Sequence, residues 1–541
     1  MPHLLVLLLA CLLLAGCNDR QSETASAGTN PAREAAGREL VYASTKDIRD
    51  INPHLYGGEM AAQAMVFESL VVNTEEGVRP CLARSWDISP DGRVYTFYLR
   101  EDVTFSDGTP FTAEVVRLNM EAVLANRARH AWLALVRVIE GHEVVDAHTY
   151  RLRLRTPYYP ALIELGLVRP FRFVAPACLV NGTSRNGLNG CIGTGPWILE
   201  EHRRHQYALF RANPRYWGHK PAFERLRWKV VPDHQSLVFA LQKGDADLVL
   251  GADGDMFNLD TFAVLQKDRR LSTAQSRPIA SRALLLNSNA DFTREREVRL
   301  ALQHAINREG IVQHVLNATE TVADTLLSPS VPYCDLNLAP RSHDPQKAAA
   351  LLDAAGWLPG SDGLREKAGK KAHLVLSYNA DNALERTIGE YIQADLKRIG
   401  VELELCGEEK QAFLDRQKTG RFQMQYALSW GAPYDPQSYL SSWRLPAHGD
   451  YQAQTGLKRK AWLDATITEL MAEQDEKRRA ALYREVLTYV HEEAVYLPLS
   501  YSRTRAVYRK ALTGVTFGCS QYEIPFEKMR FAAPGKESAA Q

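Results

Sequence analysis

The sequence lacks the compact motifs that mark a resident metal site or a common catalytic centre. It has no C-x-x-C, no H-x-x-x-H and no other Cys/His group at zinc spacing. It also lacks a G-x-S-x-G elbow, an H-E-x-x-H helix and a phosphate-binding P-loop. Scattered acidic residues select no catalytic pair, so we predict that this protein is not an enzyme.

The chain also lacks an excess of charge of either sign. Lys+Arg of 65 against Asp+Glu of 64 gives a net charge of +1, which provides no electrostatic reason to expect a nucleic-acid partner. No second long apolar run follows the N-terminus, so no transmembrane helix is expected. A hydrophobic content of 45% is ordinary for a soluble globular protein, and 541 residues exceed one core, which predicts at least two lobes.

The N-terminus carries the features of an export signal. Residues 1–16 read MPHLLVLLLACLLLAG, an apolar run too short to span a bilayer. The run ends in Leu-Ala-Gly-Cys17, which resembles the bacterial lipobox, although His3 stands where Lys or Arg is usual. We therefore predict removal of 1–16 and lipidation of Cys17, which makes the protein periplasmic or cell-surface and lipid-anchored to a bacterial membrane. The alternative is an ordinary secretory signal with an incidental cysteine. Residues 17–39 are polar and small, as in a flexible tether.

Six cysteines remain beyond the signal and Cys17. Cys178 and Cys191 flank a polar loop rich in Gly and Asn, and a disulfide between them would suit an oxidising compartment. The sequence does not assign partners to the other four, which read as small buried side chains. These four are Cys81, Cys334, Cys406 and Cys519.

Local patterns predict alternating strands and helices. Residues 40–43, 94–99 and 226–231 read as strands. Apolar residues recur at helical spacing over 384–399, Gly400 ends that helix, and 401–405 alternates as a half-buried strand. A helix followed directly by a strand is typical of an α/β protein.

An ordered series of motifs resembles the family 5 solute-binding proteins of bacterial ABC importers. The matches extend from about residue 40 to 531 and include ARSW, DGRVYTF, GTGPW, NPRYWG and AGW. Their turn residues make sense as structure, with Asp91-Gly92 as a hairpin turn and Gly193 and Gly195 as a tight entry into a strand. We therefore use them to identify the scaffold and assign them no ligand contact.

The resemblance implies a type II periplasmic-binding-protein fold of class α/β, with two lobes joined by a hinge. Lobe 1 is expected over 40–275, with an extra inserted subdomain at about 81–190, and lobe 2 over 276–503. Residues 504–541 are expected to return to lobe 1 and form the C-terminal tail. A monomer of this kind closes on its ligand and docks on the permease subunits of an ABC transporter.

Further segments are most similar to the nickel-binding members of this family. They are 52–56, 126–132, 169–173 and 430–436. The resemblance implies nickel(II) carried in a small carboxylate-bearing chelator, with Arg129 and Arg169 holding the chelator and His448 contacting the metal. It implies aromatic walls and further contacts from Trp132, Trp430, Tyr434, Tyr56 and Met60.

That ligand set makes chemical sense. Nickel(II) prefers nitrogen and oxygen ligands, and one imidazole leaves most of its positions empty for a chelator to fill. A guanidinium pairs with a carboxylate through two hydrogen bonds, which suits Arg for holding the chelator. Leu414 and Tyr522 depart from the nickel-binding pattern, and they leave the chelator's identity open.

Other ligands of the same family remain alternatives. Peptide-binding members carry an acid three residues after the tryptophan to pair with a terminal ammonium, and here that position is Pro433. Asp435 nearby could substitute for it. Haem would also suit an aromatic cleft with one His. A purely structural lipoprotein would bind none of these, and the sequence does not rank nickel against cobalt.

Overall fold

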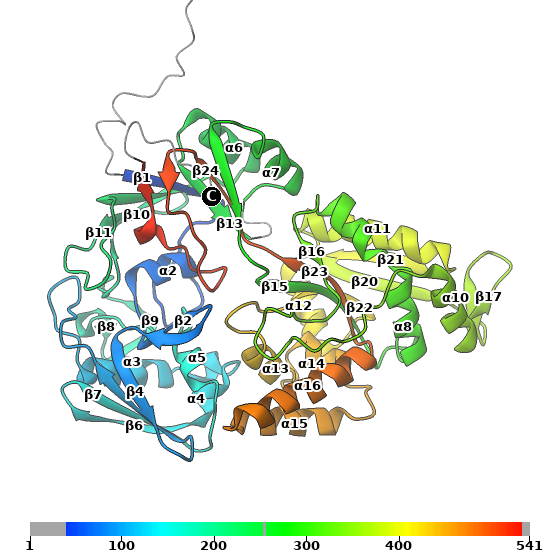
Figure 1. Cartoon of the computed structure of the whole chain (residues 1–541), viewed down its shortest axis with the longest axis horizontal. Coiled ribbons are helices and arrows are strands. Elements are labelled where there is room, and N and C mark those ends of the chain that lie inside the picture. The colour runs from blue at the N-terminus through cyan, green and yellow to red at the C-terminus, as the bar shows by residue number, and fades with distance from the viewer. Residues whose placement is uncertain (1–38, 253–255, 533–541) are drawn as a thin grey trace, which may run out of the picture. The chain divides into compact units, whose positions relative to one another are not determined.

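The computed structural model describes residues 39–252 and 256–532. The predicted signal 1–16 and Cys17 lie outside these residues. The first of two large sheets has seven strands and contains both the first strand of the described chain, β1, and the late strand β24 (Figure 1). In sheet order, its strands are β10 (Trp197–Arg203), β11 (Tyr207–Ala212), β12 (Arg225–Val230), β1 (Glu39–Ser44), β13 (Leu248–Gly251), β24 (Arg505–Arg509) and β14 (Leu271–Gln275).

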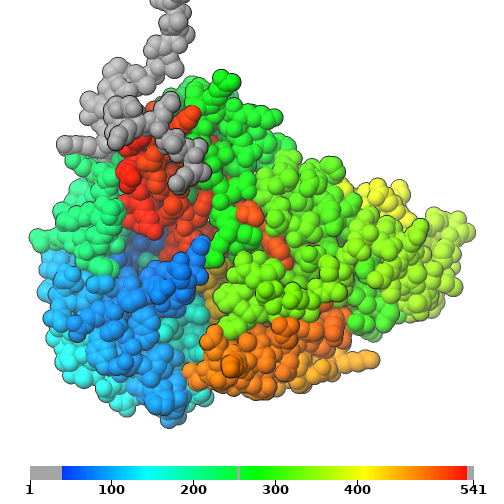
Figure 2. Space-filling model, viewed as in Figure 1, coloured from blue at the N-terminus to red at the C-terminus, as the bar shows by residue number. Residues whose placement is uncertain are grey.

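The second large sheet has six strands, all from the later half of the chain. The chain passes between the sheets twice, after Gln275 and after Ser502, which gives two lobes joined by two crossings. Figure 2 shows the C-terminal residues, in red, among the green residues of lobe 1, in accord with β24 returning to the first sheet. The residue limits of the predicted lobes stay predictions. In sheet order, the second sheet's strands are β16 (Thr321–Val322), β23 (Tyr496–Ser502), β15 (Ala280–Leu286), β22 (Met424–Leu428), β20 (His373–Asn379) and β21 (Glu402–Glu408).

A third sheet of four strands lies between β1 and β10 in the sequence. Its first turn is the predicted hairpin, where the Gly92 amide donates to the Ser89 carbonyl at 2.8 Å and Gly92 has a φ of 67°. Short helices and two-stranded pairs surround this sheet. The elements of the region are β2 (Val71–Thr74), β3 (Gly77–Pro80), β4 (Ala83–Ile88), β5 (Val94–Leu99), α3 (Ala113–Leu124), η1 (Arg127–His130), α4 (Ala134–Val138), β6 (Ile139–Asp146), β7 (Thr149–Leu154), α5 (Ala161–Leu165), β8 (Leu179–Val180) and β9 (Thr183–Leu188).

The predicted helix–strand unit of lobe 2 is present. The Asn382 side chain caps α11 by accepting from the amides of Leu384 and Glu385, and Gly400 follows the helix with a φ of 76°. β21 then pairs in parallel with β20. Among the described residues, no helix combines the length and the apolar character needed to cross a membrane. The main helices of lobe 2 are α8 (Arg296–Ala305), α10 (Pro345–Ala354), α11 (Ala383–Arg398), α12 (Lys410–Thr419), α13 (Gln437–Ser442), α14 (Gly449–Gln454), α15 (Lys460–Ala472) and α16 (Glu476–Glu492).

Two glycines explain how helix α2 (Met60–Val66) reaches its place beside β10. A Cβ atom on Gly193 would lie 2.0 Å from the Val66 carbonyl oxygen, and one on Gly195 would lie 2.5 Å from that of Met65. Only glycine permits this approach of backbone to backbone. The contact fixes α2, and with it Met60, against the first sheet. The other lobe 1 helices are α6 (His234–Lys243) and α7 (Leu259–Leu265).

Candidate functional site

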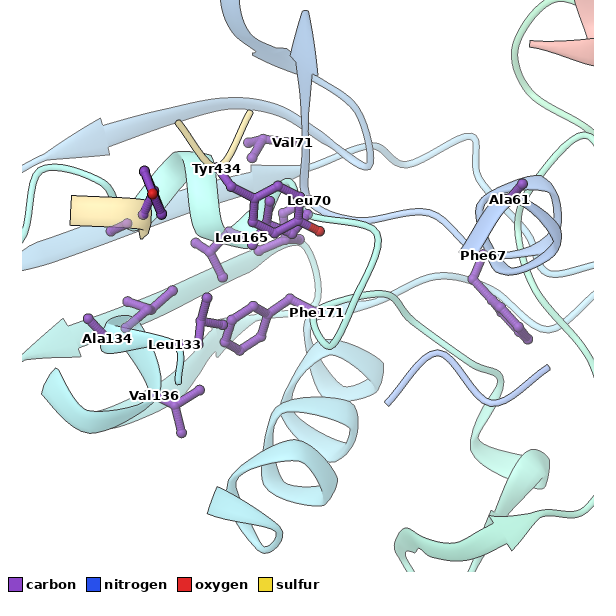
Figure 3. Packing of buried hydrophobic residues seen from close by; sticks show 14 of the residues in the cluster. Ala61, Phe67, Leu70, Val71, Leu133, Ala134, Val136, Leu165, Phe171 and Tyr434 are labelled. Atoms are coloured by element: carbon purple, nitrogen blue, oxygen red, sulfur yellow. The ribbon is translucent and has the colours of Figure 1, made fainter. Parts of the chain in front are cut away.

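Aromatic side chains from both lobes lie in contact with one another. The ring centroids of Trp132 and Trp430 lie 5.6 Å apart with planes at 70°, and Tyr434 lies 6.3 Å from each of them. Tyr522 continues the row, 6.4 Å from Tyr434. Figure 3 shows Tyr434 with Leu70 and the other buried residues of the core that it joins. The predicted walls Trp132, Trp430 and Tyr434 are therefore together.

The loop after β22 positions Trp430 and Tyr434 through an internal carboxylate. Asp435 is buried and accepts hydrogen bonds from the Ser429 hydroxyl at 2.6 Å and the Gly431 amide at 3.0 Å. Burial raises the pKa of Asp435 to about 7, against the opposing effect of these donors. Asp435 thus stabilises its own loop, which weighs against its serving as the ammonium partner of a peptide.

Arg169 lies beside Tyr56 at the lobe 1 side of the site. Its guanidinium carbon is 5.1 Å from the centre of the Tyr56 ring, and Nη1 donates to the Gly58 carbonyl at 3.3 Å. Burial lowers the pKa of Arg169, and nearby groups that include the Glu59 carboxylate oppose the shift. The contact with the Gly58 carbonyl uses only one N–H donor, so this half-buried guanidinium can still donate to a carboxylate ligand.

Arg129 and Tyr56 lie near Arg169 on the lobe 1 side of the site. Burial raises the pKa of Tyr56 to about 12, while the charges of Arg169 and Arg129 oppose the rise, so both cations lie near this hydroxyl. The Arg129 side chain is exposed, and η1 places it directly before His130. Met60 is the first residue of α2 and is half-buried, and its predicted ligand contact stays a prediction.

His448 lies on the lobe 2 side, just before α14. Its ring centroid is 5.6 Å from that of Trp430. Burial lowers the pKa of His448, against the opposing charge of Asp450, so the imidazole is neutral near pH 7 and keeps a lone pair for a metal. Asp450 itself is engaged, because it accepts from the Tyr439 hydroxyl at 2.7 Å. In the described part of the chain, no three His, Cys, Asp or Glu side chains group as a metal site, which leaves His448 as a lone imidazole.

Further contacts join the lobes around this site. The Glu164 carboxylate of α5 accepts from the Ser438 hydroxyl of α13 at 3.2 Å, and also from the Tyr158 hydroxyl at 2.6 Å and the Leu135 amide at 2.8 Å. The Tyr159 and Tyr483 hydroxyls are hydrogen-bonded to each other. These contacts pair residues that are 274 and 324 positions apart, and no local pattern in the sequence indicated them.

The Glu164 carboxyl leads to a prediction of pH dependence. Burial raises the pKa of Glu164 to about 7, from 4.5. The native state therefore holds a proton that the unfolded state releases, so stability is present below about pH 4.5 and is lost as pH rises toward 7. We expect wild type to lose up to roughly 1.4 kcal/mol per pH unit relative to Glu164→Gln in this window. Denaturant titrations at pH 5, 6 and 7 measure this difference, and parallel pH profiles of the two proteins would refute it.

The disulfide between Cys178 and Cys191 stays a prediction. In the structure both residues are free thiols, and Cys178 is buried. The main chain also closes the loop between them, because β8 pairs with β9 and the Asn189 amide donates to the Cys178 carbonyl at 2.8 Å. The two thiols are near each other, since burial and the neighbouring Cys178 both raise the pKa of Cys191. The other four cysteines within the described residues, Cys81, Cys334, Cys406 and Cys519, are also free.

Two sheets in two lobes, joined by two crossings and carrying an aromatic site between them, define the class as a two-lobed α/β solute-binding protein. The chain belongs to the bacterial extracellular solute-binding proteins, family 5, whose middle-region model matches residues 77–451.

Individual relatives agree with this family assignment. The chain is 44% identical to the nickel-binding periplasmic protein of Escherichia coli K12 over 503 residues, which covers 92% of this chain and 96% of that protein. It is 24% identical to heme-binding protein A of Haemophilus influenzae, over 92% of this chain and 93% of that protein. Among solved structures, NikA from Brucella suis in complex with Fe(III)-EDTA matches with a TM-score of 0.90 and 43% identity, over 91% of this chain and 100% of that chain. These relatives are solute-binding proteins and not enzymes.

Proposed function

We propose that this protein captures nickel(II) outside the cytoplasm, as a complex with a small carboxylate-bearing chelator, and delivers it to the permease of an ABC importer. The observation that carries the proposal is Arg169, a half-buried cation beside the Tyr56 ring at the aromatic site. The 44% identity to a nickel-binding periplasmic protein supports the choice of metal, against 24% to a heme-binding protein. The predicted lipid anchor at Cys17 belongs to the same proposal.

Binding would proceed without covalent chemistry. The chelator's carboxylates pair with the guanidinium of Arg169, and Arg129 at the exposed rim adds a second cation. The aromatic rings exclude water, and the neutral imidazole of His448 takes a coordination position that the chelator leaves open. Because the rings come from both lobes, a ligand that contacts both favours the closed state.

Native mass spectrometry of the exported protein tests the proposal. The probe is nickel(II) with citrate, a small chelator that leaves coordination positions open, and the expected species is a ternary complex of protein, metal and chelator. A complex with a plain peptide or with haem, and none with the nickel probe, would replace this function with one of the family alternatives.

Replacing His448 by alanine separates metal contact from chelator contact. We expect retention of nickel–citrate to fall roughly tenfold or more, equal to about 1.4 kcal/mol, because one metal ligand is lost. Binding of Fe(III)-EDTA should change little, since EDTA itself fills the coordination positions of the ion. His314→Ala, which removes an exposed imidazole in the same lobe, is the matched control. Equal nickel retention by His448→Ala and wild type would remove His448 from the site.

A further inference from the structure

Three side chains next to Arg169 are connected by two consecutive hydrogen bonds. The Trp132 indole nitrogen lies 2.7 Å from the Tyr56 hydroxyl oxygen, and that oxygen lies 2.6 Å from Nδ1 of His130. His130 is fully buried at the end of η1, two residues before Trp132. These hydrogen bonds therefore link Tyr56 and Trp132, two predicted ligand contacts, to a histidine that the sequence analysis did not predict as a site residue.

The chemistry of the three groups fixes the direction of the first hydrogen bond. An indole nitrogen can only donate, so the Tyr56 oxygen accepts from Trp132. The Tyr56 hydroxyl still has its own hydrogen to donate, and His130 Nδ1 lies within reach of it. We infer that the hydroxyl donates to Nδ1, which places the proton of the neutral His130 on Nε2. Burial lowers the pKa of His130 to about 4, with the charges of His54 and Arg129 acting in the same direction, so this state holds at neutral pH.

We propose that His130 is a positioning residue of the chelate site, acting through the Tyr56 hydroxyl. By accepting that hydrogen it fixes the Tyr56 ring beside the Arg169 guanidinium, 5.1 Å away. The oriented Tyr56 oxygen in turn fixes the Trp132 indole, whose ring contacts Trp430 at 5.6 Å. This inference rests on the proposed function, because what is positioned is the wall and the cation of that site.

Packing alone does not account for a histidine here. Nε2 of His130 is buried and has no hydrogen-bond partner within the described residues. A buried donor without a partner costs about 1–3 kcal/mol, so an apolar side chain of similar size would serve the core better. The acceptor at Nδ1 is what an apolar side chain could not supply.

Binding of Fe(III)-EDTA by calorimetry tests the inference with four variants. His130→Leu removes the acceptor, and Tyr56→Phe removes the hydroxyl but keeps the ring; each should weaken binding roughly tenfold. His130→Asn restores an acceptor oxygen near Nδ1 and should bind within about threefold of wild type. The double variant should be no weaker than either single one, because both remove the same link. Wild-type affinity in His130→Leu, or additive losses in the double variant, would overturn the inference.

A ligand-free readout separates this inference from the proposed function. Nitrogen-15 spectra of histidine-labelled protein report the tautomer of each imidazole, and loss of a signal in His130→Asn assigns His130. We expect the Nε2-protonated form from pH 8 to 5, and a changed Trp132 indole N–H resonance in His130→Leu. A proton on Nδ1 in wild type overturns the positioning role even if the chelate binds. If wild type fails to bind any metal chelate, the proposed function fails, and the NMR result alone decides whether His130 orders Tyr56 and Trp132.

Discussion

Replacing Glu320 by alanine is expected to lower the free energy of unfolding by about 3–5 kcal/mol. Glu320 is buried between two buried arginines, with Oε1 at 2.9 Å from Nη2 of Arg282 and 3.1 Å from Nη2 of Arg505. Its Oε2 accepts from the Ser500 hydroxyl at 2.6 Å. Removing the carboxylate leaves two desolvated guanidinium groups without their shared counter-ion, which costs more than the pair itself contributes.

The position of this cluster in the fold increases the expected effect. Arg505 lies in β24 of the first sheet, whereas Arg282 and Ser500 lie in β15 and β23 of the second. Glu320 therefore accepts hydrogen bonds from strands of both sheets, next to the crossings between the lobes. Burial raises the pKa of Glu320, but the charge of Arg282 and the hydrogen bonds lower it overall, so the carboxylate is ionised at neutral pH.

Urea denaturation followed by tryptophan fluorescence measures the change. Glu320→Gln keeps the volume and one acceptor oxygen, and should fall between wild type and Glu320→Ala. Glu309→Ala, an exposed glutamate in the same lobe, serves as the matched control and should change stability by less than about 0.5 kcal/mol. A loss below about 1 kcal/mol for Glu320→Ala would show that the cluster does not hold the lobes as described.

Replacing Arg169 by alanine is expected to weaken Fe(III)-EDTA binding roughly 30- to 150-fold, or about 2–3 kcal/mol. Arg169 is half-buried beside the Tyr56 ring, so its interaction with a carboxylate is less screened than at the surface. Arg169→Lys keeps the charge but loses the planar fork, and should lie between alanine and wild type.

The controls for Arg169 address folding and general charge. Arg204→Ala removes an exposed cation from lobe 1 and should leave binding unchanged. The melting temperature of Arg169→Ala without ligand should stay near that of wild type, because its loss removes only a 3.3 Å hydrogen bond to the Gly58 carbonyl and a contact with the Tyr56 ring. Equal affinity for Arg169→Ala and wild type would refute the assignment of the chelator contact.

The local elements could be predicted from the sequence because their determinants are local. The strand over 94–99 alternates buried and half-buried side chains, and Gly400 ends the helix α11 by adopting a positive φ. The glycines at 193 and 195 precede β10, in accord with the predicted tight entry into a strand, and they also allow close packing on α2. The family resemblance then fixed how these elements assemble, which periodicity alone could not.

The proximity of three aromatic residues followed from the family resemblance and not from local patterns in the sequence. Trp132, Trp430 and Tyr434 were brought together by resemblance, and the structure places their rings in contact. His130 and Glu164 were missed, because a lone buried histidine or glutamate carries no pattern until its partners are known. The disulfide between Cys178 and Cys191 stays a prediction, and the hairpin of β8 and β9 between these cysteines was not part of it.

A crystal structure of the protein with nickel(II) and citrate tests the central claim most directly. We expect a citrate carboxylate on the Arg169 guanidinium, the ligand against Trp132 and Trp430, and the His448 imidazole bound to the metal. A site that holds a peptide, with the Pro446–Gly449 segment turned away from it, would refute chelate binding at this site.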